Sequence, residues 1–218
     1  MFRVSRLKEH RLSRDIENLL IKKILELAPT LDGIVVSDFV YGVITPRILE
    51  VLGSVSKDNA IPLYGDLQCS SQVGNIAKFR DFQLLCPTER EARIALNNQD
   101  DGVEYVANLL MKETRSFNLI LKLGADGFIA YSRDINNNFV YRQHFPALTI
   151  NPVDVAGAGD SLLASIAFGL STGLTLMEAS AFGCCVAAIA VQTIGNIPVD
   201  YHAVKMFVER QDLGSNAV

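Results

Sequence analysis

The chain has 218 residues, 49% of them hydrophobic, which is enough apolar material for a sizeable core and excludes a disordered chain. Its formal net charge of −4, with no basic stretch, excludes a general binder of nucleic acids or membrane surfaces. We expect one domain over residues 1–218, with no signal peptide and no apolar run long enough to span a bilayer.

The first half of the chain alternates predicted helices with predicted buried strands. Apolar residues at helical spacing follow Ser13 and stop before Pro29, and Thr45 with Pro46 opens a second helix. The other elements predicted here are strands over residues 33–39, 61–66 and 82–86 and helices over residues 88–96 and 103–111.

The second half begins with strands and ends with helices. Strands are predicted over residues 118–124, 127–133, 139–145 and 148–153. A long apolar helix follows Gly159, and another starts at Leu176 behind a capping box formed by Thr175 and Glu178. Strands that alternate with helices predict an α/β fold with a mostly parallel sheet.

Cysteines and histidines carry no metal-binding spacing. The four cysteines, Cys69, Cys86, Cys184 and Cys185, form no C-x-x-C pair, and the three histidines lie far apart in the sequence. A zinc site is therefore not expected. Free thiols in a reducing cytoplasm are the favoured interpretation.

The stretch NPVDVAGAGD (151–160) places two glycines and two aspartates at the start of the apolar helix. No P-loop pattern is present, and Leu162 occupies the third glycine position of the dinucleotide-binding pattern, which argues against a nicotinamide-dependent enzyme. The N–H groups at this helix start suit the charge of a transferring phosphoryl group, and Asp160 is placed to take a proton from an attacking hydroxyl. The alternative is that Asp160 only stabilises the helix start and the glycines only permit a tight turn.

Together with five other stretches, this turn resembles the ribokinase-like carbohydrate kinase family, whose signature is Asp-Thr-x-Gly-Ala-Gly-Asp. The other stretches are VSDFVYGVIT (36–45), GDLQ (65–68), CPTEREA (86–92), KLGADG (122–127) and CCVAAIAVQTIGN (184–196). They are most similar to the heptose-phosphate kinase branch. The sequence departs from the family at four positions, where it has Tyr41, Gln68, Thr88 and Val155.

The resemblance implies a ribokinase-like three-layer α/β sandwich that corresponds to the C-terminal, nucleotide-binding part of such a kinase, with the N-terminal strands and the lid absent. It implies ATP-dependent phosphoryl transfer to a hydroxyl of a sugar or sugar phosphate, with Mg²⁺ and a monovalent cation as cofactors. The implied catalytic base is Asp160, and the anion hole is formed by Gly157, Ala158 and Gly159.

The resemblance also assigns residues around the nucleotide and the metal. Asp154 fixes the loop or a monovalent cation, Asn196 contacts adenine or ribose, and Glu91 acts on magnesium through water. The residues implied to border the nucleotide are Lys122, Gly124 and Gly127. For Glu91 the alternative is a capping box with Thr88.

A second hypothesis is a catalytically silent nucleotide-binding or scaffolding module derived from such a kinase. The departures at Tyr41, Gln68, Thr88 and Val155 favour this hypothesis, whereas the intact Gly-Ala-Gly-Asp turn favours the enzyme. Expected partners are ATP and a sugar or sugar phosphate, with a second copy of the chain or a complementing N-terminal segment. Neither nucleic acid nor membrane is an expected partner.

Overall fold

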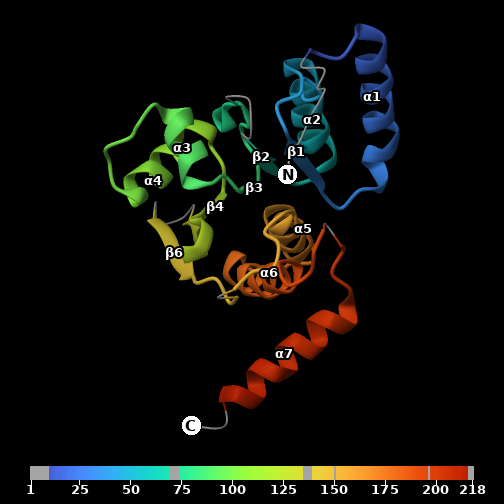
Figure 1. Ribbon diagram of the computed structural model, residues 1–218. Coiled ribbons are helices and arrows are strands. Elements are labelled where there is room, and N and C mark those ends of the chain that lie inside the picture. The colour runs from blue at the N-terminus through green and yellow to red at the C-terminus, as the bar shows by residue number, and fades with distance from the viewer. Residues whose placement is uncertain (1–9, 69–73, 135–138, 150, 196, 216–218) are drawn as a thin grey trace, which may run out of the picture. The chain divides into compact units, whose positions relative to one another are not determined.

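The computed structural model describes residues 10–68, 74–134, 139–149, 151–195 and 197–215 (Figure 1). The chain forms two compact units, Met1–Phe117 and Asn118–Val218. Within the described residues, every helix is too short or too polar to cross a membrane.

The first unit is built from parallel strands and helices (Figure 1). Strand β1 (Ile34–Asp38) pairs in parallel with β2 (Leu63–Leu67), which pairs in parallel with β3 (Leu84–Leu85). The helices of this unit are α1 (Arg14–Leu27), α2 (Pro46–Asn59), α3 (Glu89–Leu96) and α4 (Val103–Thr114), with short 3₁₀ turns η1 (Ala28–Thr30) and η2 (Ile76–Lys78). Helix α2 is the crossover that parallel pairing of β1 with β2 requires.

Local sequence explains the start of α2 and the core beneath it. Pro46 occupies the first helical position, and the Thr45 hydroxyl accepts a hydrogen bond of 3.2 Å from the N–H of Ile48. All five residues of β2 are buried, as expected for a central parallel strand. A cluster of Ala28, Val55 and Ile61 joins η1, α2 and the segment just before β2.

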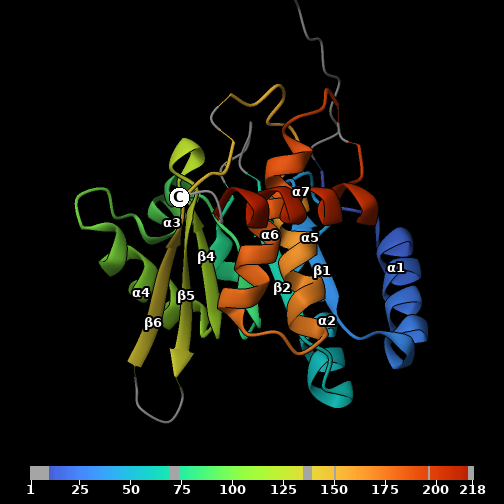
Figure 2. The same cartoon turned by 90° about the horizontal axis from the view of Figure 1, so that it is seen from below.

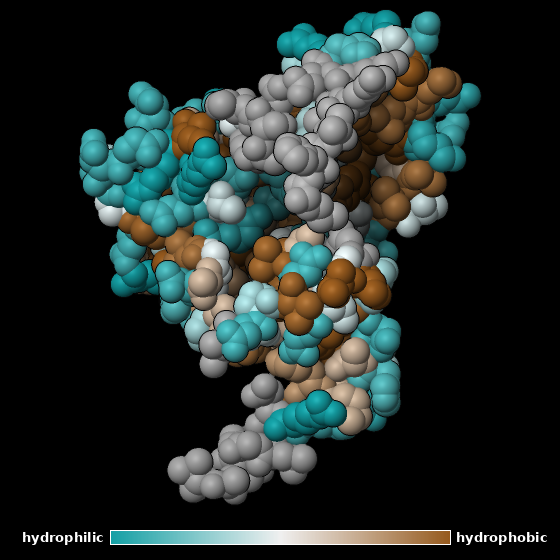
Figure 3. Space-filling model, viewed as in Figure 1, coloured by the Kyte–Doolittle hydropathy of each residue, from teal (hydrophilic) through white to brown (hydrophobic). Residues whose placement is uncertain are grey.

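Helix α1 packs one apolar face against the unit and leaves other apolar side chains exposed. Ile21 is buried, whereas Ile16, Leu19 and Leu25 are each more than half exposed. Figure 3 shows hydrophobic surface at the position of α1. Strand β1 also has an uncovered face, because Val35 is 48% exposed while Val36 is buried.

The second unit combines antiparallel strands with helices. Strands β4 (Asn118–Lys122), β5 (Phe128–Asp134) and β6 (Phe139–Phe145) lie side by side in Figure 2, and both pairs are antiparallel. A 3₁₀ turn, η3 (Gly124–Asp126), joins β4 to β5. The helices are α5 (Ala158–Ser171), α6 (Leu176–Ala190) and α7 (Tyr201–Ser215), and α5 packs against α6.

The predicted α/β class is confirmed, and most predicted elements are present with ends shifted by a few residues. One prediction is wrong, because residues 148, 149 and 151–153 form no strand. Their polar groups bond instead to the end of α6: the Thr149 hydroxyl donates to the carbonyl of Ala188, and the N–H of Val153 donates to the carbonyl of Val191. Helix α7 was not predicted.

Candidate active site

The Gly-Ala-Gly-Asp turn forms the start of α5. Gly157 is the N-cap residue and has φ +78°, a left-handed conformation that favours glycine. The first helical bond runs from the N–H of Ser161 to the carbonyl of Gly157 at 2.9 Å. Asp160 therefore lies in the first turn of α5, as predicted, and is half-buried there.

The N–H groups of this turn differ in their hydrogen bonding. The N–H of Ala158 donates to the carbonyl of Val155 at 3.3 Å, so it is partly engaged within the loop. Within the described residues, the N–H groups of Gly157 and Gly159 donate no hydrogen bond. The helix start thus keeps at least two donors for an anion, as the helix dipole favours.

Asp154 ties this loop to the segment that follows α6. One carboxylate oxygen accepts the N–H of Ala156 at 2.9 Å, and the other accepts the N–H of Gly195 at 3.0 Å. These two backbone donors, Ala156 first, hold the pKa of the Asp154 carboxyl below its usual range. The N–H of Asp154 itself donates to the carbonyl of Val191 at 3.2 Å. Asp154 has the contacts of a residue that fixes loop geometry.

The segment after α6 contributes Gly195, which has φ +85° and open space where a Cβ would lie. The predicted nucleotide contact Asn196 lies outside the described residues. Three exposed apolar side chains surround the Asp154 junction: Val153, Val155 and Ile194.

The turn between β4 and β5 contains the three residues predicted to border the nucleotide. Lys122 is the last residue of β4 and is paired in register with Phe128. Gly124 has φ +65° with open space around it, whereas Gly127 has φ +82° and its Cβ would meet the carbonyl oxygen of Phe145 at 2.1 Å. Packing of this turn against the end of β6 therefore explains Gly127 without a ligand.

Glu91 forms the capping box that was its alternative interpretation. Its carboxylate accepts the N–H of Thr88 at 2.8 Å, and the Thr88 hydroxyl accepts the N–H of Glu91 at 3.2 Å. The side chain is buried. Across the described part of the chain, no group of three or more His, Cys, Asp or Glu residues has an arrangement that would hold a metal ion. A direct metal ligand set is absent from these residues.

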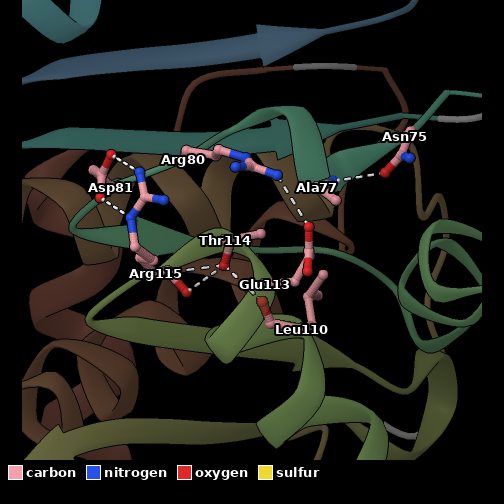
Figure 4. Close-up of polar contacts among 9 residues, drawn as sticks. Asn75, Ala77, Arg80, Asp81, Leu110, Glu113, Thr114 and Arg115 are labelled. Carbon is pink, nitrogen blue, oxygen red and sulfur yellow. Dashed lines mark hydrogen bonds and ion pairs between the residues drawn. The ribbon is translucent and has the colours of Figure 1, made fainter.

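The second unit thus contains all the predicted site residues except Glu91, which belongs to the first. Sequence reasoning did not find a cavity of about 820 Å³ in the first unit, which extends along α2. One end is lined by Asp38 and Lys78. The other end is lined by Asp81 and Arg115, which form a two-point ion pair with N···O distances of 2.7 and 2.5 Å (Figure 4).

Comparison with known proteins identifies relatives of this chain. The family model described as "pfkB family carbohydrate kinase" matches residues 16–201. The bifunctional protein HldE of Wolinella succinogenes is 25% identical over 208 residues, which cover 94% of this chain and 42% of the relative. HldE of Trichlorobacter lovleyi is 30% identical over 200 residues, or 90% of this chain and 39% of the relative. The chain spans about two fifths of the length of these curated relatives.

Solved structures show the same fold. Escherichia coli phosphofructokinase-2 in complex with potassium has a TM-score of 0.72 at 19% identity, with 93% of this chain and 64% of that chain covered. Arabidopsis thaliana ribokinase, complexed with ribose and ATP, has a TM-score of 0.70 at 17% identity, with 93% and 61% covered. The fold is therefore the ribokinase-like α/β fold that the sequence predicted.

Proposed function

Because the chain belongs to the pfkB family of carbohydrate kinases, we propose that it transfers the γ-phosphoryl group of ATP to a hydroxyl of a sugar or sugar phosphate. The start of α5 carries this proposal, since it combines a carboxylate in the first helical turn with two backbone N–H groups that donate no hydrogen bond to any described residue. The family match extends from residue 16 to residue 201 and includes both units, which supports one kinase domain.

In this proposal Asp160 is the catalytic base. Phosphoryl transfer needs the acceptor hydroxyl to lose its proton as the new O–P bond forms, and a positioned carboxylate is suited to accept that proton. Asp154 has a structural role in the loop, because its two carboxylate oxygens already accept the N–H groups of Ala156 and Gly195. It holds the loop in the shape that presents Gly157 and Gly159.

The N–H groups of Gly157 and Gly159 stabilise the negative charge on the transferring group. Donors fixed before the reaction need no reorganisation when the charge develops, which is why such groups contribute strongly to catalysis. Ala158 contributes less than its neighbours, since its N–H has a partner in Val155. This ranks the predicted members of the anion hole.

The nucleotide and the metal are assigned to different residues in this proposal. We assign ATP to the second unit, where Lys122, Gly124 and the exposed apolar side chains around Asp154 would border it. Magnesium, when bound, neutralises phosphate charge, and Glu91 would contact it through water because its carboxylate also caps α3. A monovalent cation beside Asp154 is part of the same proposal, and a potassium complex is known for one structural neighbour.

We also propose that copies of the chain associate through the first unit and that the protein works in the cytoplasm. The exposed apolar side chains of α1 and the uncovered Val35 on β1 support association. A partner that supplies a complementing N-terminal segment would cover the same surface. Free thiols at Cys86, Cys184 and Cys185 agree with a reducing compartment.

Two measurements test the function. The first is calorimetric titration with Mg-ADP, and the second is a coupled ADP-release assay with pentoses, hexoses and heptose phosphates. We expect nucleotide binding and slow, acceptor-dependent ADP release. Asp160→Asn lowers that release by about 10²–10⁴-fold and leaves nucleotide affinity nearly unchanged. Asp32→Asn, at an exposed site in the first unit, is the matched control.

Three outcomes are informative. An unchanged rate in Asp160→Asn shows that Asp160 only stabilises the start of α5. Nucleotide binding without ADP release under any acceptor favours the catalytically silent module. Absence of nucleotide binding contradicts the proposal as a whole.

A further inference from the structure

The ring of His144, on β6, bonds to the turn between β4 and β5, and the proposed mechanism does not use this contact. Its Nε2 atom lies 2.7 Å from the carbonyl oxygen of Asp126, the last residue of η3. A carbonyl oxygen only accepts hydrogen bonds, so Nε2 is the donor and carries the proton. The contact therefore fixes which ring nitrogen is protonated in the neutral form and holds the Asp126 carbonyl in one direction.

The end of β6 also limits the turn by close packing. A Cβ at Gly127 would meet the carbonyl oxygen of Phe145 at 2.1 Å, so the two backbones approach closely here. Next to this approach, the rings of Phe128 and Phe145 are stacked with their centroids 5.1 Å apart. The residue that follows is fixed as well, because the thiol of Cys184 on α6 donates to the carbonyl of Pro146 at 3.3 Å. The end of β6 is thus a fixed support for the turn.

The turn itself has few contacts of its own. All three residues of η3 are exposed. A bond of 2.8 Å from the N–H of Leu123 to the carbonyl of Gly127 closes the turn, but the bonds donated within it by Asp126 and Gly127 are longer, at 3.3 and 3.2 Å. Exposed segments with few buried contacts open locally at a low free energy. The bond from His144 is therefore an important restraint on η3.

Both partners in this bond are accessible to water, which separates a positioning role from a role in overall stability. His144 and Asp126 are exposed, so each polar atom regains a hydrogen bond to water when the contact is lost. The folded state then stays nearly as stable, but the turn adopts more conformations. A ligand that binds only one of these conformations binds more weakly, because the turn loses more entropy when it is ordered.

We propose that His144 is a positioning residue that holds the β4–β5 turn in the conformation that binds the nucleotide. The role of the turn rests on the proposed kinase function, in which Lys122 and Gly124 border ATP. His144 acts through the carbonyl of Asp126. It therefore sets the affinity for the nucleotide, whereas the rate of phosphoryl transfer depends on Asp160.

The test compares His144→Phe with His144→Gln. Phenylalanine keeps a planar ring without a donor, whereas the glutamine amide donates a hydrogen bond from a side chain of similar reach. We expect His144→Phe to weaken Mg-ADP binding by about 3–10-fold in calorimetry and to raise KM for ATP by a similar factor, with kcat within about twofold of native. His144→Gln retains most of the affinity.

Hydrogen exchange of the nucleotide-free protein gives a readout that does not depend on activity. The amides of Asp126 and Gly127 should exchange faster in His144→Phe than in the native protein, while the thermal midpoint changes little. His202→Phe is the matched control, because His202 is exposed on α7 and its ring forms no hydrogen bond within the described residues. It should change neither the exchange rates of the turn nor the affinity for Mg-ADP.

Three results each overturn the proposal: native affinity for Mg-ADP in His144→Phe, an equal loss of affinity in His144→Gln, or native exchange rates at Asp126 and Gly127 in His144→Phe. Failure of the native protein to bind Mg-ADP contradicts the kinase function instead. The exchange rates then still decide whether His144 holds the turn, so the two failures are distinguishable.

Discussion

The hydroxyl of Thr45 donates a hydrogen bond of 2.5 Å to the carboxylate of Glu17, and this contact joins α1 to the start of α2. The same hydroxyl caps α2 through Ile48, so one side chain serves both helices. Arg14 and Arg47 complete the surroundings of Glu17 with N···O distances of 3.2 and 3.1 Å. The acid is buried, and its contacts fix how α1 lies on the first unit.

The first prediction is that Glu17→Gln destabilises the protein most at neutral pH. The Thr45 hydrogen bond, followed by that of Arg47, lowers the pKa of Glu17 below its ordinary value of 4.5. Its contribution to stability is therefore complete above that value and is lost as the pH falls through the lower folded pKa. Urea midpoints from pH ~7 to ~3 should converge for native protein and variant.

Glu26→Gln is the control for this prediction, because Glu26 is exposed on α1 and its ion pairs within the described residues are with Lys22 and Lys23 on the same helix. It should change the midpoint little at any pH. A Glu17→Gln protein with the native midpoint at neutral pH would show that the contact to Thr45 does not stabilise the unit.

The second prediction contrasts Gly127→Ala with Gly124→Ala. Both glycines have positive φ, but an alanine Cβ at residue 127 meets the Phe145 carbonyl whereas residue 124 is surrounded by open space. We expect a loss of about 1–2 kcal/mol for Gly124→Ala from backbone strain and a loss larger by about 1–3 kcal/mol for Gly127→Ala. Denaturant unfolding gives both values, and equal losses would contradict the close approach to β6.

The third prediction is that Asp154→Ala loosens two separate backbone segments together. The carboxylate bonds the N–H groups of Ala156 and Gly195, so both amides should exchange hydrogen faster in the variant. The lowered pKa of Asp154 means that native protein loses this protection only as the pH falls below the ordinary value of 3.8. Faster exchange at Ala156 alone would disprove the link to the segment after α6.

The fourth prediction is that Ala60→Gly stabilises the protein. Ala60 ends α2 with φ +54°, where a residue other than glycine pays about 1–2 kcal/mol. Glycine removes that cost but adds about 0.4–1 kcal/mol of unfolded-state entropy, which leaves a gain of about 0.5–1 kcal/mol. Ala107→Gly, inside α4, should destabilise instead. Thermal unfolding of the two variants checks the opposite signs.

Helix starts were the features most accurately predicted from sequence. The starts of α2 and α6 are predicted by Thr45 with Pro46 and by Thr175 with Glu178, since capping depends on residues close together in the chain. The strand predicted over residues 148–153 was wrong because contacts distant in the sequence decide the structure there. Its apolar spacing suits a strand, but the bonds of Thr149 and Val153 go to α6, a partner that local sequence does not specify.

The site was predictable to the extent that it lies in one turn. Asp160 and Gly157 are positioned by the start of α5, which the sequence marks. The bond from Gly195 to Asp154 spans 41 residues, and the bond from His144 to Asp126 spans 18. Such contacts depend on the folded chain, so His144 carried no signal in the sequence.

The two strand systems differ in how much chain must be closed to form them. In the second unit, β5 follows β4 after a short turn, a connection that forms quickly because few residues separate the partners. In the first unit, β1 meets β2 only after α2 has been crossed, so its pairing is intrinsically slower. During synthesis the slower unit emerges first. During translation, the parallel strands β1 and β2 can therefore pair before β4, β5 and β6 have been synthesised and can form competing strand pairs.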